Sequence, residues 1–187
     1  MRAVFFIILL CCTSCGWRVA DTYSKNNAHT LSIPYAYGDD NGLLTAEVIA
    51  QVQKETAFSY VREGGEYTLY VTLLDAKNQS IGFRYDPEKL KNGKKRIIPD
   101  EVRRELLAKV SVVHAASNQE VLGPEFIIGS TEFDHRYYNL SHDINNYSLG
   151  QLTDIDTTYD VVDVPLQRDL AIQIALWLEN NADSLYK

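Results

Sequence analysis

The sequence predicts an α+β domain, with a mostly antiparallel four-stranded sheet and two helices on one face, in the order β-α-β-β-β-α. Three observations predict this class. Two segments repeat apolar residues at helical spacing, several others alternate apolar and polar residues as strands do, and turn residues separate them. The chain has 187 residues, of which 45% are hydrophobic, and this is enough apolar surface for one core.

The first strand is short and is followed by a helix. Alternating apolar residues predict the strand, at Leu31, Ile33 and Tyr35. Pro34 places it at an edge of the sheet or at its own end. Turn residues at 38–42 predict the cap of a helix that runs from Leu43 to about Thr56. Its buried face is made by residues four apart, at Leu44, Val48 and Val52.

The clearest strand covers residues 67–73, where Tyr, Leu, Val and Leu alternate with Thr, Tyr and Thr. Because the helix at 43–56 lies between this strand and the first, the three elements are expected to form a right-handed crossover. A further extended piece, Ile81 to Tyr85, leads into a basic run with Asn92-Gly93 at its centre. This dipeptide is a turn signal, so we expect a protruding loop or hairpin tip.

Two more strands and a helix complete the domain. Alternation predicts a strand over 104–112, although Asp100 to Arg103 could equally begin a helical turn. Turns are expected at 117–119 and at Gly123-Pro124, and aromatic and β-branched residues predict the fourth strand over 126–138. The polar residues 139–159 are expected to be a long connection. A helix should start at Asp163 and Pro165 and end near Leu178. Its apolar face is Leu166, Leu170, Ile174 and Trp177.

The cysteines indicate how the chain is processed. All three, Cys11, Cys12 and Cys15, lie within the first fifteen residues, which excludes a disulfide framework in the domain. Arg2 and the apolar run from Ala3 are typical of a secretory signal, and the run is about half of the ~20 residues that span a bilayer. Thr-Ser-Cys-Gly at 13–16 resembles a bacterial lipobox, with Cys12 in place of the usual Leu. Simple secretion without a lipid is the alternative.

The expected organisation is therefore a lipoprotein signal peptide at 1–14, a lipid-anchor linker at 15–28 and a single domain at 29–187. Cys15 would carry the acyl chains, which add about 0.8 kcal/mol of membrane affinity for each buried methylene. If the resemblance to bacterial lipoproteins holds, Gly16 after this cysteine implies sorting to the outer membrane. The domain would then face the periplasm.

The charge of the chain is acidic, with one basic exception. Eighteen Lys and Arg against twenty-five Asp and Glu give a net charge of -7, which argues against a nucleic-acid partner. The exception is a cluster of five cations at Lys89, Lys91, Lys94, Lys95 and Arg96. Such a cluster can bind phosphates, and Arg84 and Arg103 could add bidentate contacts. The alternative is a hairpin tip that its lysines merely keep soluble.

No arrangement of residues predicts an enzyme, a metal site or a cofactor. The sequence lacks a G-x-S-x-G motif and phosphate-binding glycine loops. Asp134 and His135 are adjacent, so on a strand they would point to opposite faces. The four histidines are scattered, without zinc-ligand spacing. The acidic residues 154–160 lack the Gly and Glu of a calcium loop, so we interpret them as a solvated acidic turn.

Several segments resemble the LptE family of lipopolysaccharide-assembly lipoproteins. The likeness covers nearly the whole mature chain, from Cys-Gly-Trp through the strand at 30–35 to the C-terminal helix. A divergent branch is indicated by four segments, at 82–86, 122–124, 133–138 and 148–154. Their sequences are Gly-Phe-Arg-Tyr-Asp, Leu-Gly-Pro, Phe-Asp-His-Arg-Tyr-Tyr and Ser-Leu-Gly-Gln-Leu-Thr-Asp.

This resemblance implies a non-catalytic plug inside the lumen of an LptD-like outer-membrane β-barrel, where it helps the barrel fold and assists lipopolysaccharide insertion into the outer leaflet. From charge clustering alone, we expect the residues that contact lipid phosphates to be Lys91, Lys94, Lys95, Arg96 and Arg84. A lipoprotein that scaffolds a different envelope complex, in the periplasm or at the cell surface, is the alternative. A second alternative is an enzyme that uses Asp134 and His135, or the acidic residues 154–163.

Overall fold

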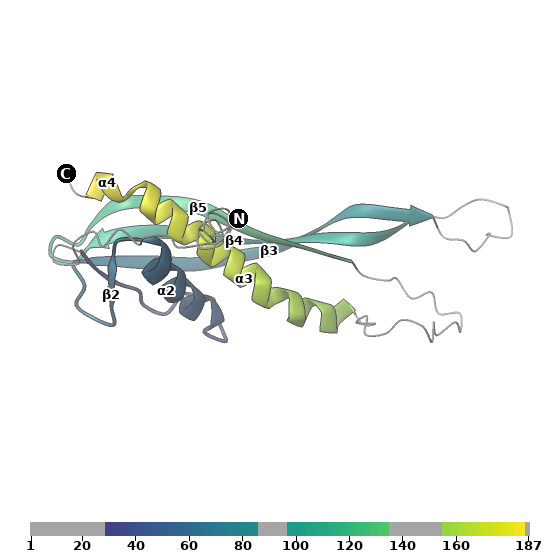
Figure 1. Cartoon of the computed structure of the whole chain (residues 1–187), viewed down its shortest axis with the longest axis horizontal. Coiled ribbons are helices and arrows are strands. Elements are labelled where there is room, and N and C mark those ends of the chain that lie inside the picture. Colours follow the sequence, from purple (N-terminus) through teal and green to yellow (C-terminus); the bar gives the residue numbers. More distant parts are fainter. Residues whose placement is uncertain (1–28, 86–96, 135–154, 186–187) are drawn as a thin grey trace, which may run out of the picture.

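The computed structural model describes residues 29–85, 97–134 and 155–185. They form a five-stranded mixed sheet in the order β2-β1-β3-β4-β5, with helices packed across one face (Figure 1). The strands are β1 (Thr30–Ser32), β2 (Ser59–Val61), β3 (Tyr67–Tyr85), β4 (Ile97–His114) and β5 (Gln119–Asp134). The helices are α2 (Leu43–Glu55), α3 (Ile155–Asn180) and α4 (Ala182–Leu185). The predicted α+β class is confirmed.

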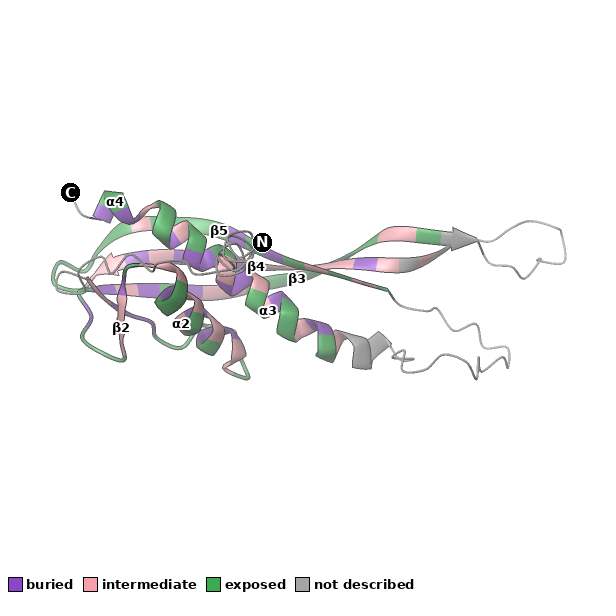
Figure 2. Cartoon of the chain, viewed as in Figure 1, coloured by how far each residue is buried: buried purple, intermediate pink, exposed green. Residues whose placement is uncertain are grey.

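Strands β3, β4 and β5 form an antiparallel meander, while β1 runs parallel to both β2 and β3. Side chains of a strand alternate between the two faces of a sheet. In β3, Leu69 and Val71 are buried under the helices, whereas Tyr70 between them is 48% exposed. In Figure 2, buried and more exposed residues alternate along the strands where the sheet lies beside the helices. One face therefore carries the core and the other is open.

Helix α2 begins at the predicted turn. Gly42 occupies the cap position with a φ of 74°, in the left-handed region that favours glycine. Asp39 supplies the side-chain cap from three residues earlier. Its buried carboxylate oxygen Oδ2 accepts hydrogen bonds from the Thr45 amide, at 2.8 Å, and from the Thr45 hydroxyl, at 2.6 Å. The predicted helix cap is confirmed, and Leu44, Val48 and Val52 are buried as expected.

Helix α3 buries the predicted apolar face, but it begins earlier than predicted. Three residues of that face, Leu166, Leu170 and Ile174, are almost completely buried, and the fourth, Trp177, is partly buried against the core. The helix starts at Ile155 instead of Asp163, so Pro165 lies in its interior. Proline removes one backbone hydrogen bond there. The first turns persist because Tyr159, Val162 and Asp163 pack against the sheet.

The prediction of a long connection over 139–159 is therefore wrong for residues 155–159, which are helical. The solvated acidic turn that we expected over 154–160 is wrong for the same residues. Residues 139–154 lie outside the described part of the chain.

The two helices contact each other as well as the sheet. The Arg168 guanidinium of α3 donates to the Glu47 carboxylate of α2, with Nη2 and Oε1 3.2 Å apart. Helix α3 also approaches β5 closely at Gly129. A Cβ atom there would lie 2.6 Å from the backbone nitrogen of Leu170, so only glycine fits this contact without displacement.

Strand number and order differ from the prediction. The sheet has a fifth strand, β2, whose three residues are too few to produce a recognisable alternation. Strand β1 lies between β2 and β3, so it is not an edge strand, and Pro34 follows its end. The strand-end interpretation of Pro34 is the correct one.

Strand limits also changed. The predicted strand at 67–73 and the extended piece at 81–85 belong to one strand, because a bulge after Leu73 lets pairing with β4 continue. Residues 100–103 are part of β4 and do not start a helical turn. The Gly123-Pro124 dipeptide lies inside β5 at an irregularity in its pairing with β4, where we expected a turn between strands.

Candidate functional site

The predicted lipidation and phosphate-binding residues lie mostly outside the described residues. This is true of Cys15, Lys91, Lys94, Lys95 and Arg96. Arg84 belongs to β3, and its backbone is paired with that of Ile98 in β4. The structure nevertheless places the two chain segments that lead to these residues, and it places them far apart.

The basic segment 86–96 joins the far ends of β3 and β4. The last pair of this ladder is Tyr85 with Ile97, so the segment connects two antiparallel neighbours, as in a hairpin. Strand β3 alone has 19 residues, and at about 3.3 Å per residue it extends roughly 60 Å. Figure 1 shows the β3–β4 ribbon reaching well beyond the helices. We call this part, residues 76–85 and 97–105, the distal ribbon.

Exposed apolar side chains flank the basic segment. Phe83 and Ile97 are each 60% exposed. Because Tyr85 is opposite Ile97 and two residues from Phe83, the regular ladder places Phe83 and Ile97 on the same face. The base of the predicted tip thus combines an apolar face with a neighbouring run of cations.

Of the arginines singled out by sequence, Arg103 is engaged by a carboxylate. Its Nε and Nη2 atoms donate to Oε1 of Glu132 in β5, at 2.9 and 2.5 Å. This hydrogen bonding, and then the charge of Glu132, raise the pKa of Arg103. Arg103 is therefore committed to a cross-strand pair and does not add a free cation to the basic segment.

The neighbouring Arg104 holds α3 to the distal ribbon. Its Nε lies 2.9 Å from Oδ1 of Asp163, and its guanidinium carbon lies 4.7 Å from the centre of the Tyr159 ring. Tyr159 also accepts a hydrogen bond from Asn78 at 3.3 Å and packs edge-on against Phe133. No local motif marks this cluster in the sequence, because its members come from four elements.

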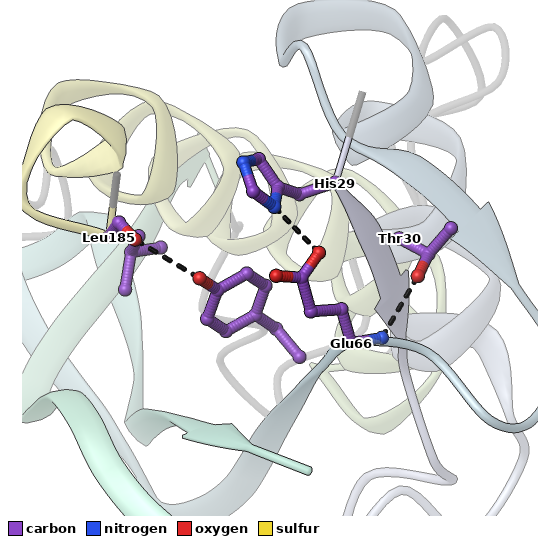
Figure 3. Close-up of polar contacts among 5 residues, drawn as sticks. His29, Thr30, Glu66 and Leu185 are labelled. Atoms are coloured by element: carbon purple, nitrogen blue, oxygen red, sulfur yellow. Dashed lines mark hydrogen bonds and ion pairs between the residues drawn. The ribbon is translucent and has the colours of Figure 1, made fainter. Parts of the chain in front are cut away.

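At the opposite end of β3, the chain enters the domain at His29. Its ring nitrogen Nδ1 lies 2.6 Å from Oε2 of Glu66, and the Glu66 amide donates to the Thr30 hydroxyl at 2.9 Å (Figure 3). Edge-on to the His29 ring, Tyr67 donates its hydroxyl hydrogen to the carbonyl of Leu185 at 3.0 Å. We call these residues, His29, Thr30, Glu66, Tyr67 and Leu185, the entry cluster.

The entry cluster ties the first described residues to the last described helix, α4. Tyr67 stands at its centre, edge-on to the rings of His29, Phe58 and His114. Burial, and then the charge of Glu66, raise the pKa of the Tyr67 hydroxyl, which stays a hydrogen-bond donor at neutral pH. The lipid-anchor linker predicted for residues 15–28 would thus join the domain at residues that these contacts hold in place.

The residues considered for catalysis do not form a catalytic arrangement in the described part of the chain. Asp134 is exposed at the end of β5, and His135 lies outside the described residues. Asp163 is paired with Arg104. Among residues 29–85, 97–134 and 155–185, no three His, Cys, Asp or Glu side chains gather as metal ligands. None of the described helices is long and apolar enough to cross a bilayer.

Comparison with known proteins identifies a shared fold. Neither a family model nor a curated protein matches the chain. Among solved structures, rare lipoprotein B from Shewanella oneidensis has a TM-score of 0.50 at 11% identity, over 84% of this chain and 99% of that one. A lipoprotein from Caulobacter crescentus has a TM-score of 0.47 at 13% identity, over 80% and 88%. The minor lipoprotein from Acinetobacter baumannii gives 0.46 at 12% identity, over 82% and 94%. At such identities the likeness concerns the fold alone.

Proposed function

We propose that this protein is a lipid-anchored lipoprotein of the outer membrane that acts as an LptE-like plug of an LptD-type β-barrel. In this proposal Cys15 carries the acyl chains and the basic segment 86–96 contacts lipopolysaccharide. The protein catalyses no reaction. The lipobox-like sequence and the fold shared with rare lipoprotein B support the lipoprotein part.

One observation carries the proposal. The entry cluster and the basic segment lie at opposite ends of β3, roughly 60 Å apart along the strand. An acyl anchor before His29 would hold the first end near a membrane surface, and the distal ribbon would hold the cations far from that attachment. Such a separation suits a protein that must bring a binding segment to a lipid distant from its anchor.

The chemistry of the distal ribbon suits an amphiphile that carries phosphates. The cations at 91–96 would contact phosphate groups, which an acidic chain of net charge -7 would otherwise repel. Phe83 and Ile97 offer apolar surface to acyl chains next to those cations. Lipopolysaccharide presents both phosphates and acyl chains, whereas a free phosphate would use only the cations.

Purification from membranes tests the plug. We expect a tagged full-length chain to bring down an outer-membrane β-barrel in stoichiometric amount, and the mass of its native N-terminus to equal that of a chain starting at an acylated Cys15. Recovery of an acylated chain with other envelope proteins and no barrel would favour the scaffolding alternative. An unmodified Cys15 thiol would contradict the anchor.

A further inference from the structure

The outer edge of β5 contains a short run without backbone partners among the described residues. Strand β5 is the last described strand of the sheet, so on one side it has no neighbour among the described strands. The Ser130 amide donates to the Asp169 carboxylate of α3 at 2.8 Å, which shows that even-numbered residues here direct their N–H groups away from β4. In antiparallel pairing this direction alternates, so Phe126 and Ile128 do the same.

Two features limit this run. Pro124 has no N–H to donate, and proline is a common means of blocking an exposed sheet edge. At the other limit, Asp169 occupies the Ser130 amide, and α3 lies against Gly129. Between these limits no described residue pairs with the edge over residues 125–128, and the edge presents the N–H and C=O groups of Phe126 and Ile128.

A groove follows the open edge. It has a volume of about 600 Å³ and lies between β5 and the second half of α3. Its main lining residues are Glu125, Phe126, Ile128, Gln173, Leu176 and Trp177. Leu176 is 42% exposed on the α3 side of this edge, and Phe126 and Ile128, 59% and 53% exposed, lie on the opposite face because they alternate with buried Ile127 and Gly129. The edge therefore offers apolar surface on both sides of its unpaired backbone groups.

Charge defines what can bind there. Strand β5 carries four acids and no cation, at Glu120, Glu125, Glu132 and Asp134; Glu132 is paired with Arg103, and Glu125 is the acid within the open run. A second copy of this chain would therefore meet like charges along a β5–β5 pair, which is unfavourable. A partner strand must instead alternate, with apolar side chains on the face of Phe126 and Ile128 and cations on the face of Glu125.

We propose that the edge of β5 between Pro124 and Asp169 is a docking site for an extended, basic segment of a partner protein. The segment adds a strand to the sheet, and its backbone hydrogen bonds with Phe126 and Ile128 provide the affinity. Its lysine or arginine stems lie along Leu176 while their charges face Glu125. This inference does not depend on the proposed function.

The experiment uses the full-length chain in detergent and an acetylated peptide of alternating Lys and Val, about eight residues long. Binding should slow hydrogen exchange at the Phe126 and Ile128 amides, while Ile127 and Gly129, already bonded to β4, stay unchanged. Ile128→Pro should weaken binding about tenfold because it removes one N–H, and Ile128→Thr, which keeps that N–H, should weaken it less than about threefold.

Several results would contradict the proposal. No peptide binding at about 1 mM, or binding without protection of Phe126 and Ile128, would overturn the proposal. Equal binding of a Glu-Val peptide would overturn the basic chemistry. Self-association that protects the same two amides would assign the edge to a second copy. Because hydrogen exchange uses the unsubstituted protein, the test stands even if Ile128→Pro fails to fold.

Discussion

Arg104 of β4 and Asp163 of α3 form an ion pair that is partly shielded from water, with Nε and Oδ1 2.9 Å apart. No described residue offers the Arg104 Nε–H group an aligned hydrogen-bond acceptor, so the contact with Asp163 acts through charge. The Arg104 side chain is only 16% exposed, whereas that of Arg103 in its own pair is 41% exposed. Neighbouring arginines of one strand thus provide a matched comparison of shielded and exposed pairs.

Replacing Arg104 with Leu should lower the free energy of unfolding by about 1–3 kcal/mol, because it removes the Asp163 pair and the contact with Tyr159 and leaves a carboxylate unpaired. Urea denaturation measures this change. Hydrogen exchange should also quicken in residues 159–163. The control, Arg103→Leu, should cost no more than about 1 kcal/mol, since exposed pairs contribute little. Equal losses in the two variants would contradict the role given to Arg104.

Replacing Asp39 with Ala should destabilise the protein by about 1–2 kcal/mol. The carboxylate is buried and accepts hydrogen bonds from both the amide and the hydroxyl of Thr45, so its loss leaves the start of α2 uncapped. Thermal unfolding provides the measurement. Asp40→Ala is the control, because Asp40 is exposed and should change stability by less than about 0.5 kcal/mol.

Replacing Gly129 with Ala should cost about 1–3 kcal/mol by forcing α3 away from β5, since the new methyl group would overlap the Leu170 backbone. Ser130→Ala is the matched control. Ser130 uses only its backbone amide to reach Asp169, so removal of its hydroxyl should change little. Chemical denaturation of both variants distinguishes them, and a neutral Gly129→Ala would show that α3 does not lie this close.

Tyr67 should make stability sensitive to alkaline pH. Its folded pKa is raised above the ordinary value of 10.0, so its contribution is complete below pH 10.0 and is lost as the pH rises through the folded pKa. Tyr67→Phe should cost about 0.5–1.5 kcal/mol at neutral pH, through the lost bond to Leu185, and should flatten the decline above pH 10.0.

Unfolding free energies measured across this range test the prediction for Tyr67. Tyr37→Phe is the control at neutral pH, because Tyr37 is 78% exposed and its loss of a hydroxyl should leave stability unchanged. An alkaline decline that is equally steep with Phe at position 67 would contradict the assignment.

Much of the fold could be predicted from local patterns. Alternation at Leu69 and Val71 identified the central strand, and the spacing of Leu166, Leu170 and Ile174 identified the buried face of α3. The cap at Asp39 followed from turn chemistry. These predictions succeeded because each pattern is set by neighbours in the sequence.

The errors came from contacts distant in the sequence. Ser59–Val61 becomes a strand through pairing with β1, which no three-residue pattern reveals. The early start of α3 depends on Tyr159 and Asp163 meeting Arg104, which lies 55 and 59 residues before them in the sequence, and these contacts outweigh the break that Pro165 predicts. For the candidate site, the sequence alone reveals the basic composition of segment 86–96, because composition is a local property. The distance between this segment and the entry cluster could not be predicted, because it depends on the β3–β4 register.

Binding of lipopolysaccharide by a charge-reversed chain tests the central claim most directly. Lys94, Lys95 and Arg96 would be replaced by Glu. The control would replace Lys54, Arg62 and Lys109 by Glu, and in both variants three changes of -2 take the net charge from -7 to -13. We expect the first variant to lose affinity, more at low salt than at high salt, and the control to bind as the unsubstituted chain does. Equal binding by the two variants at low salt would contradict the assignment of lipopolysaccharide to the basic segment.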